Sequence, residues 1–267
     1  MTDQPPEQSE LRTARGGADG TLHGDDIARL VALLDFSYPA DVQPVFADLP
    51  GPAFFPGGSG ILLRGHAART LPAGGVMVLG HNFSTVKYYE GLRLAGRENL
   101  NKDTWGKLLP FLAECGISVE ECFFTNALMG VMRTRSNVGS VSGHEEIGFR
   151  EHCHRVFRAA LCWQRPRLLL ALGKPTIRFV AEAFPDQLDF WSRIQRRSYR
   201  LLDVEDPDGP VRRGVPLPDG SGSFSLVALV HPSFRHLPWN APRRKFRGQQ
   251  GMDCERAMVT HALEETR

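Results

Sequence analysis

Four short apolar runs, each followed by polar or turn-forming residues, divide the chain into a regular pattern. They consist mainly of Val, Leu, Met, Phe and Ala, and Gly, Pro, Asn or charged residues flank them. Apolar runs of this length are typical of strands that are buried on both faces. We therefore predict strands at Val76 to Gly80, Cys122 to Thr125, Arg167 to Leu172 and Ser225 to Val230.

Segments with apolar residues at helical spacing lie between and around these runs. They predict helices from Thr104, as N-cap, to Gly116, from Gly148 to Trp163 and from Pro175 onward. A terminal helix is expected after a cap at Asp253, and a short helix after a cap at Asp25 or Asp26. Strands that alternate with helices favour a parallel sheet with right-handed crossovers. The expected fold class is therefore α/β, with helices on both faces of a central four-stranded parallel sheet, a three-layer α/β/α arrangement.

The remaining segments indicate how the chain is organised around this core. Residues 1–24 carry Pro, Gly, Gln and charge with little to bury, which predicts a disordered tail. The Pro/Gly-rich stretch from Pro39 to Gly65 is expected to wrap the surface, and Asp203 to Gly222 is a turn-rich insertion for which a hairpin is one form. Because no repeat or linker interrupts residues 25–267, we expect a single domain, with its motifs within about 75–247.

Composition places the chain in an ordinary class. Of its 267 residues 42% are hydrophobic and 23% charged, and the net charge of +2 produces no global field that demands a polyanion. No apolar stretch approaches the roughly 20 residues that span a bilayer, and the first residues lack the apolar core of a signal peptide. Five cysteines without a CxxC pair favour reduced thiols. We therefore expect a cytoplasmic protein without a membrane partner, and a monomer.

Two apparent motifs are weaker than they look, and one common catalytic motif is absent. Gly173-Lys174-Pro175-Thr176 lacks the earlier Gly of a phosphate-binding loop. His152-Cys153-His154 offers metal-ligand residue types, but adjacent helical residues point about 100° apart and do not share one ion. The chain also has no GxSxG elbow, so an α/β-hydrolase would lack its nucleophile.

Polar groups follow three of the predicted strands at their carboxyl ends. They are Gly80-His81-Asn82, Thr125-Asn126 and His231-Pro232-Ser233. In an open parallel sheet the ligand crevice lies outside the carboxyl ends of the strands. If these strands are neighbours, two Asn and one or two His side chains converge there, which is a composition suited to reading a nucleobase. Taken singly, a strand-end Asn or His is more often a turn or structural residue.

In this order and spacing, the motifs resemble those of the uracil-DNA glycosylase superfamily. The residues that carry the resemblance are Val78 to Phe83, Phe124 to Asn126 and Val230 to Ser233, and it covers roughly Gly75 to Arg247. It implies a uracil-DNA glycosylase-like domain and hydrolysis of the N-glycosidic bond of uracil or a related damaged base in DNA, as in base excision repair. Some branches of the superfamily bind an iron–sulfur cluster through four Cys. Because no Cys precedes Cys115, we expect no cluster and no other cofactor.

The resemblance also implies roles for individual residues. Asn126 would read the edge of the flipped base, His231 would donate to the oxyanion that develops on it, and Asn82 would orient the attacking water. His81 stands where some branches have Glu, and it offers an alternative base. The remaining base-binding positions would be Gly80, Phe83 for stacking (with Tyr88 or Tyr89 as alternatives) and Ser233.

DNA contacts are expected after the His-Pro-Ser motif, where the superfamily carries a loop that wedges an apolar side chain into the duplex. Phe234, Leu237 or Trp239 would supply the wedge. The phosphate contacts would come from Arg235, Arg243, Arg244, Lys245 and Arg247.

One departure from the superfamily pattern, together with the chemistry of Asn82, keeps other functions open. Phe83-Ser84 replaces the expected Pro and Gly, and the amide of Asn82 cannot accept a proton at neutral pH. A non-catalytic nucleic-acid- or nucleotide-binding protein on the same fold is therefore an alternative. A third hypothesis is an unrelated doubly wound enzyme that acts on a nucleoside or another small molecule.

Overall fold

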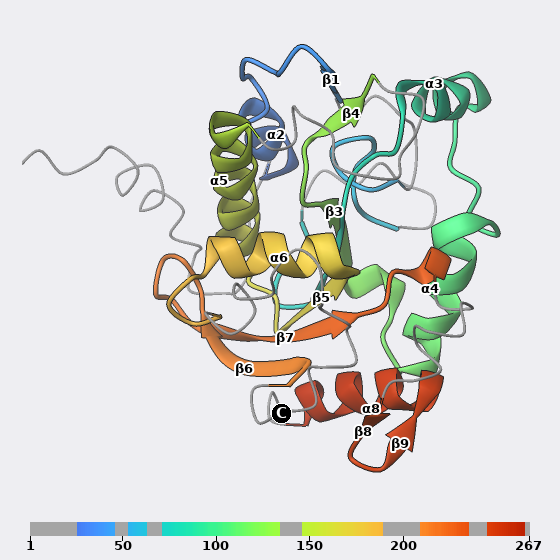
Figure 1. Ribbon diagram of the computed structural model, residues 1–267, viewed down its shortest axis with the longest axis vertical. Coiled ribbons are helices and arrows are strands. Elements are labelled where there is room, and N and C mark those ends of the chain that lie inside the picture. The colour runs from blue at the N-terminus through green and yellow to red at the C-terminus, as the bar shows by residue number, and fades with distance from the viewer. Residues whose placement is uncertain are drawn as a thin grey trace, which may run out of the picture.

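A five-stranded sheet is the centre of the protein. The computed structural model describes residues 26–45, 53–62, 71–133, 146–188, 209–234 and 245–264. The strand order is β3-β2-β5-β7-β6 (Figure 1). Neighbouring strands pair in parallel from β3 to β7, and β6 pairs antiparallel with β7. The strands are β2 (Val76–Gly80), β3 (Cys122–Asn126), β5 (Leu168–Leu172), β6 (Val211–Pro216) and β7 (Ser223–Leu229).

The four predicted parallel strands are confirmed, but the sheet has a fifth strand that the apolar pattern did not predict. Strand β6 contains Arg, Gly and Pro and carries an irregular register between Arg212 and Val215. Such a sequence is tolerated at the edge of a sheet, where Pro and bulges limit further pairing. In its described part, the turn-rich insertion supplies one strand and the turn of a hairpin, whose second strand is β7.

Alternate residues of the strands face two different apolar layers. Val76 and Val78 pack with the helices α4 and α8, whereas Met77 and Leu79 pack with α5 and α6. In Figure 1, α6 and α8 lie on opposite sides of β7. Since a strand presents successive side chains to opposite faces, apolar runs of this kind require a covering layer on each side. The architecture is mixed α/β and compatible with a three-layer α/β/α fold.

The predicted helices are present with shifted ends. They are α2 (Asp26–Ala32), α4 (Asp103–Glu114), α5 (Ile147–Gln164), α6 (Lys174–Ala183) and α8 (Gly251–Leu263). Two predicted caps are wrong. The N-cap of α4 is Lys102, because the hydroxyl of Thr104 contacts Ser233 instead, and the N-cap of α8 is Gln250, because Asp253 lies inside the helix and pairs with Arg256.

One helix was not predicted at all. Helix α3 (Val86–Ala95) lies in the segment between β2 and α4. Its N-cap is Thr85, whose hydroxyl accepts a hydrogen bond from the backbone N–H of Tyr88, and its C-cap Gly96 has a φ of 66°. Only Tyr89 of this helix is buried. A helix with so small an apolar face leaves almost no periodic signal in the sequence.

The segment before the sheet does not wrap the surface as predicted. Within residues 53–62, the backbone N–H of Phe55 donates to Phe124 O (2.9 Å) and Gly60 O accepts from Phe124 N (2.7 Å). The segment therefore completes the hydrogen bonding of β3 at its outer edge, and Phe54 and Phe55 are buried. Nearby, β1 (Val42–Pro44) and β4 (Gly130–Met132) form a two-stranded sheet.

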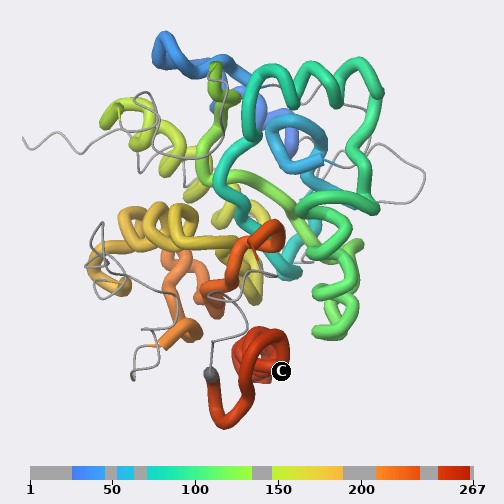
Figure 2. The backbone as a smooth tube through the Cα atoms, turned by 45° about the vertical axis from the view of Figure 1, so that its right-hand side comes forward, coloured from blue at the N-terminus to red at the C-terminus, as the bar shows by residue number. Residues whose placement is uncertain are grey.

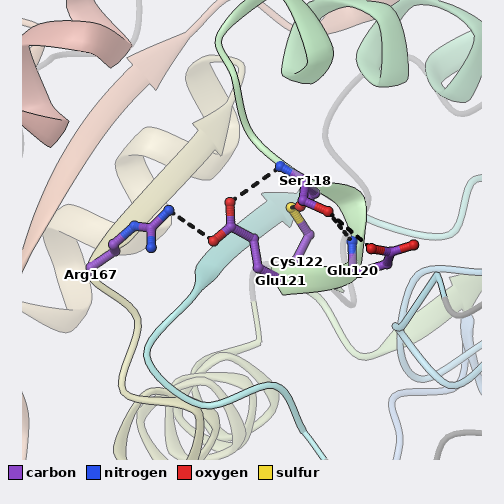
Figure 3. Close-up of polar contacts among 5 residues, drawn as sticks. All are labelled: Ser118, Glu120, Glu121, Cys122 and Arg167. Atoms are coloured by element: carbon purple, nitrogen blue, oxygen red, sulfur yellow. Dashed lines mark hydrogen bonds and ion pairs between the residues drawn. The ribbon is translucent and has the colours of Figure 1, made fainter.

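The amino end of the sheet is held by a polar network (Figure 3). A 3-10 turn, η1 (Val119–Glu121), precedes β3, and Ser118 and Glu121 form its capping box. The other carboxylate oxygen of Glu121 pairs with Arg167, just before β5, at 2.8 Å. Because this network lies at the opposite end of the strands from the predicted site, we assign it to the alignment of β3 and β5.

The chain after β7 forms the 3-10 turn η4 (Pro232–Phe234) and, further on, the hairpin of β8 (Lys245–Phe246) and β9 (Gln249–Gln250). The predicted tail at 1–24 lies outside the described residues. None of the helices in the described part of the chain is long and apolar enough to cross a membrane.

Candidate functional site at the carboxyl edge of the sheet

The predicted strand-end motifs lie at one edge of the sheet. Because β2, β3 and β7 are parallel, Gly80, Asn126 and Val230 all mark the carboxyl end, and Gly80 is in register with Asn126. Asn126 and His231 are separated by three strand spacings, about 14 Å between backbones. They therefore do not hydrogen-bond to each other. A ligand lying over the ends of β2 and β5 would contact Asn126 on one side and His231 on the other.

Asn126 presents a buried amide at this edge. Asn126 is 4% exposed, and its backbone N–H donates to Phe55 O at 3.3 Å. The side-chain amide makes no hydrogen bond to another described residue. The Oδ1 atom lies directly over Gly80, where any Cβ atom would overlap it. A buried amide with unused donors and acceptors is suited to a polar, flat ligand.

His231 is held in one orientation by its neighbours. Its Nδ1 accepts a hydrogen bond from the backbone N–H of Ser233 at 3.3 Å. In a neutral imidazole the other nitrogen then carries the proton, so this geometry assigns Nε2 as the donor. On the other side, a Cβ atom on Gly173 would lie 3.0 Å from the Cβ atom of His231, and Gly173 has a φ of 86°. Only glycine satisfies both conditions at position 173.

The turn η4 brings the last motif against helix α4. Figure 2 shows the chain after β7 approaching the start of α4. The hydroxyls of Ser233 and Thr104 lie 3.4 Å apart. Phe234 is 50% exposed, with its ring centroid 5.8 Å from that of His231. The structure therefore places one large exposed apolar side chain directly beside His231.

The side chain of Asn82 is engaged within its own turn. Its Oδ1 accepts from the backbone N–H of Ser84 (3.2 Å), and its Nδ2 points to Met132 Sδ (3.8 Å). Ser84 has a φ of 66°, so Asn82 supports a left-handed residue. His81 is partly exposed beside it, and its carbonyl oxygen accepts from Leu128 N at 3.0 Å.

Two buried aromatic rings near the edge differ in their neighbours. Phe83 is 6% exposed, because its ring lies against Gly57 and meets Tyr89 edge-on. Phe54, which the sequence reasoning missed, lies beside Gly80, where a Cβ atom would be 3.2 Å from its ring. The ring centroid of Phe54 is 4.7 Å from that of Trp105. An apolar pair inside a Pro/Gly-rich stretch was the only sequence signal for Phe54.

A titratable group that the sequence reasoning missed, Glu98, is hydrogen-bonded to the side chain of Trp105. Burial is the main cause that raises the pKa of Glu98 to about 7; nearby Asp103 raises this pKa further, while a hydrogen bond from the Trp105 side chain lowers it. Burial, followed by Glu98 and Asp103, raises the pKa of Tyr88 to about 12. Tyr88 therefore faces an acidic group between α3 and α4. No pattern identified Glu98, because α3 itself was not predicted.

The predicted DNA-contacting residues are only partly described. Arg235, Leu237, Trp239, Arg243 and Arg244 lie outside the described residues, and Lys245 lies in β8. Arg247, in the turn between β8 and β9, directs its guanidinium to His261 Nε2 on α8 (2.9 Å) and over the ring of Phe246. Its position is set by α8 rather than by the carboxyl edge.

No metal-binding group was found in the part of the chain that the structure describes, as judged from clusters of three or more His, Cys, Asp or Glu side chains. The two His of the His-Cys-His motif diverge, as predicted. His152 stacks on Phe36 at 4.1 Å between ring centroids, and His154 contacts Phe179 O on α6 at 3.2 Å. No family model matches the sequence, and no curated protein matches it significantly.

Proposed function

We propose that this chain is a DNA glycosylase that hydrolyses the N-glycosidic bond of uracil or a related damaged base, as in base excision repair. The observation that carries the proposal is the pairing of two groups at one sheet edge. A buried Asn126 amide without a hydrogen bond in the described chain lies at one side, and a His231 oriented to donate from Nε2 lies at the other.

These two groups match what the reaction requires. Cleavage leaves negative charge on the departing base, and the base must first be flipped out of the stack and recognised by its edge. The amide of Asn126 offers a donor and an acceptor for that edge. One hydrogen bond from His231 Nε2 to the developing oxyanion would contribute about 2.7–4 kcal/mol, by analogy with oxyanion holes.

The flipped base also needs an aromatic surface. Phe83 was the expected partner, but its ring is engaged with Gly57 and Tyr89. Phe54 is also buried and packs against Trp105 and Phe124, but it lies next to Gly80, the register partner of Asn126, so we propose it as the stacking ring. Phe234, exposed beside His231, is the described candidate for the duplex wedge. The finer fold assignment, a uracil-DNA glycosylase-like single domain acting as a monomer on DNA, is part of the same proposal.

Cleavage of a labelled oligonucleotide that contains one uracil tests this function. The oligonucleotide is offered single-stranded and opposite Gua or Ade, and alkali treatment reveals abasic sites. We expect cleavage by the wild type and a loss of at least about 100-fold in Asn126→Ala and in His231→Ala. His154→Ala, at the contact of α5 with α6, is the matched histidine control and should retain activity per folded molecule.

A non-catalytic base- or nucleotide-binding protein is the second candidate, and one observation favours it. The Oδ1 atom of Asn82 already accepts a hydrogen bond from Ser84, and an amide takes no proton at neutral pH. A pure binder would show salt-dependent affinity for DNA, lost in Asn126→Ala, without any turnover. Cleavage that is abolished in His231→Ala would exclude it.

A further inference from the structure

A buried carboxyl group on α8 contacts the strand that carries His231. Glu255 is 0% exposed, and its Oε1 accepts a hydrogen bond from the backbone N–H of Val230 at 2.7 Å. Val230 immediately precedes His231. The contact joins residues 25 positions apart in the sequence and links the first turns of α8 to the carboxyl end of β7.

Among the described residues, this bond takes the place of a strand partner beyond Pro210. On the β6 side of β7, pairing reaches Val227 opposite Val211, and Ala228 N then donates to Pro210 O at 2.8 Å. Because alternate N–H groups of a strand point to the same side, the N–H of Val230 is the next one that needs an acceptor. The bond to Glu255 therefore fixes the backbone beyond the last residue of β7, up to His231.

Burial of the Glu255 carboxyl group at this position is energetically unfavourable. Around it, the apolar cluster includes Leu229, Cys254 and Met258. A polar group in such surroundings is disfavoured unless it is hydrogen-bonded, and an apolar side chain would pack there without that cost. Through its bond to the N–H of Val230, the carboxyl group fixes the backbone directly before His231, which an apolar residue would not do.

We propose that Glu255 is a positioning residue for His231. This inference rests on the proposed function. Three contacts then fix the imidazole: Glu255 holds the preceding backbone, Gly173 abuts the Cβ atom, and the N–H of Ser233 holds Nδ1. Together they hold the imidazole, with Nε2–H as its donor, at the carboxyl end of β7. Glu255 itself does not touch the substrate.

Nuclear magnetic resonance tests the positioning without any substrate. In Glu255→Met, whose side chain has similar length and no acceptor oxygen, we expect the Val230 amide to exchange about tenfold faster relative to Ala228. The ¹⁵N shifts of the His231 ring should move from the Nε2–H tautomer towards an average of the two. Glu255→Gln keeps an acceptor oxygen and should preserve both signals. Gln164→Leu, a fully buried polar-to-apolar change at the amino end of β2, is the matched control and should leave them unchanged.

Kinetics then separate positioning from stability. In folded Glu255→Met, kcat for uracil release should fall up to about 100-fold with little change in KM, and Glu255→Gln should recover most of it. If Glu255→Met does not fold, Glu255→Asp withdraws the oxygen by one methylene and provides the same readouts. Unchanged His231 ring signals in a folded Met or Asp variant would overturn the proposal. If the wild type cleaves no uracil, only the proposed function fails, because the ring signals still decide the positioning.

Discussion

The amide oxygen of Asn126 occupies the space that a side chain at position 80 would need. Gly80 and Asn126 are register partners on β2 and β3, and a Cβ atom at Gly80 would overlap Asn126 Oδ1. The backbone of Gly80 does not have a positive φ, so glycine is required here for close approach rather than for conformation. The smallest side chain at this position would therefore move the amide that we assign to base reading.

Gly80→Ala should consequently reduce base recognition more than it reduces folding. We expect uracil cleavage, or uracil-DNA binding, to fall at least about tenfold, and unfolding to be easier by about 1–3 kcal/mol, because Ala overpacks a filled site. A double-mutant cycle with Asn126→Ala should be strongly non-additive, since both changes remove the same group. Gly91→Ala on α3, where nothing lies near the added methyl group, is the control and should slightly stabilise the protein. Additive losses would contradict the coupling.

Asn82→Asp tests whether water activation limits the reaction. A carboxylate oxygen can still accept the hydrogen bond from Ser84 N, so the turn should persist. The new group can also take a proton, and general-base catalysis contributes about 10²–10⁴-fold where it operates. We expect a higher kcat for uracil release, with circular dichroism unchanged. A folded Asn82→Asp protein that is slower than the wild type would remove Asn82 from the water-positioning role.

Glu98 should destabilise the folded protein at neutral and alkaline pH. Its pKa is raised from 4.5 to about 7 in the folded state, chiefly by burial, so the folded state retains a proton that the unfolded state loses. Stability attributable to this group is therefore lost as the pH rises from about 4.5 through 7. Glu98→Gln keeps an acceptor for Trp105 and should be more stable than the wild type at pH 8, with a difference that shrinks towards pH 4.5. Urea unfolding at both pH values measures it.

The two His side chains of α5 should have the opposite effect on the pH dependence of stability: they should lower the stability of the fold as the pH falls. Burial, with a smaller effect of nearby Arg side chains, lowers the pKa values of His152 and His154 from 6.5 to about 4. Their contribution to stability is complete above pH 6.5 and is lost as the pH falls towards 4, because the unfolded state binds the protons first. His152→Gln should reduce the loss of unfolding free energy between pH 7 and 4, as measured by urea unfolding. An unchanged slope would mean that His152 is protonated equally in both states.

Much of the fold could be read from the chain because the strongest patterns are local. The apolar runs at Val76 to Gly80 and Leu168 to Leu172 have no polar face, so only a strand covered on both sides accommodates them. Helix α5 likewise shows a continuous apolar face. The edge strand β6 and the exposed helix α3 were missed for the converse reason: neither buries enough of its surface to leave a periodic signal.

By itself, the sequence determined which residues stand at the strand ends, among them Asn82, Asn126 and His231, and, because the strands run parallel, that those ends meet at one edge. Only the tertiary structure decided what each side chain does there. It engages Asn82 with Ser84, leaves the Asn126 amide over Gly80, and brings Phe54 and Glu255 to the edge from distant segments. Side-chain orientation depends on contacts between residues far apart in the chain, and such contacts leave no trace in local periodicity.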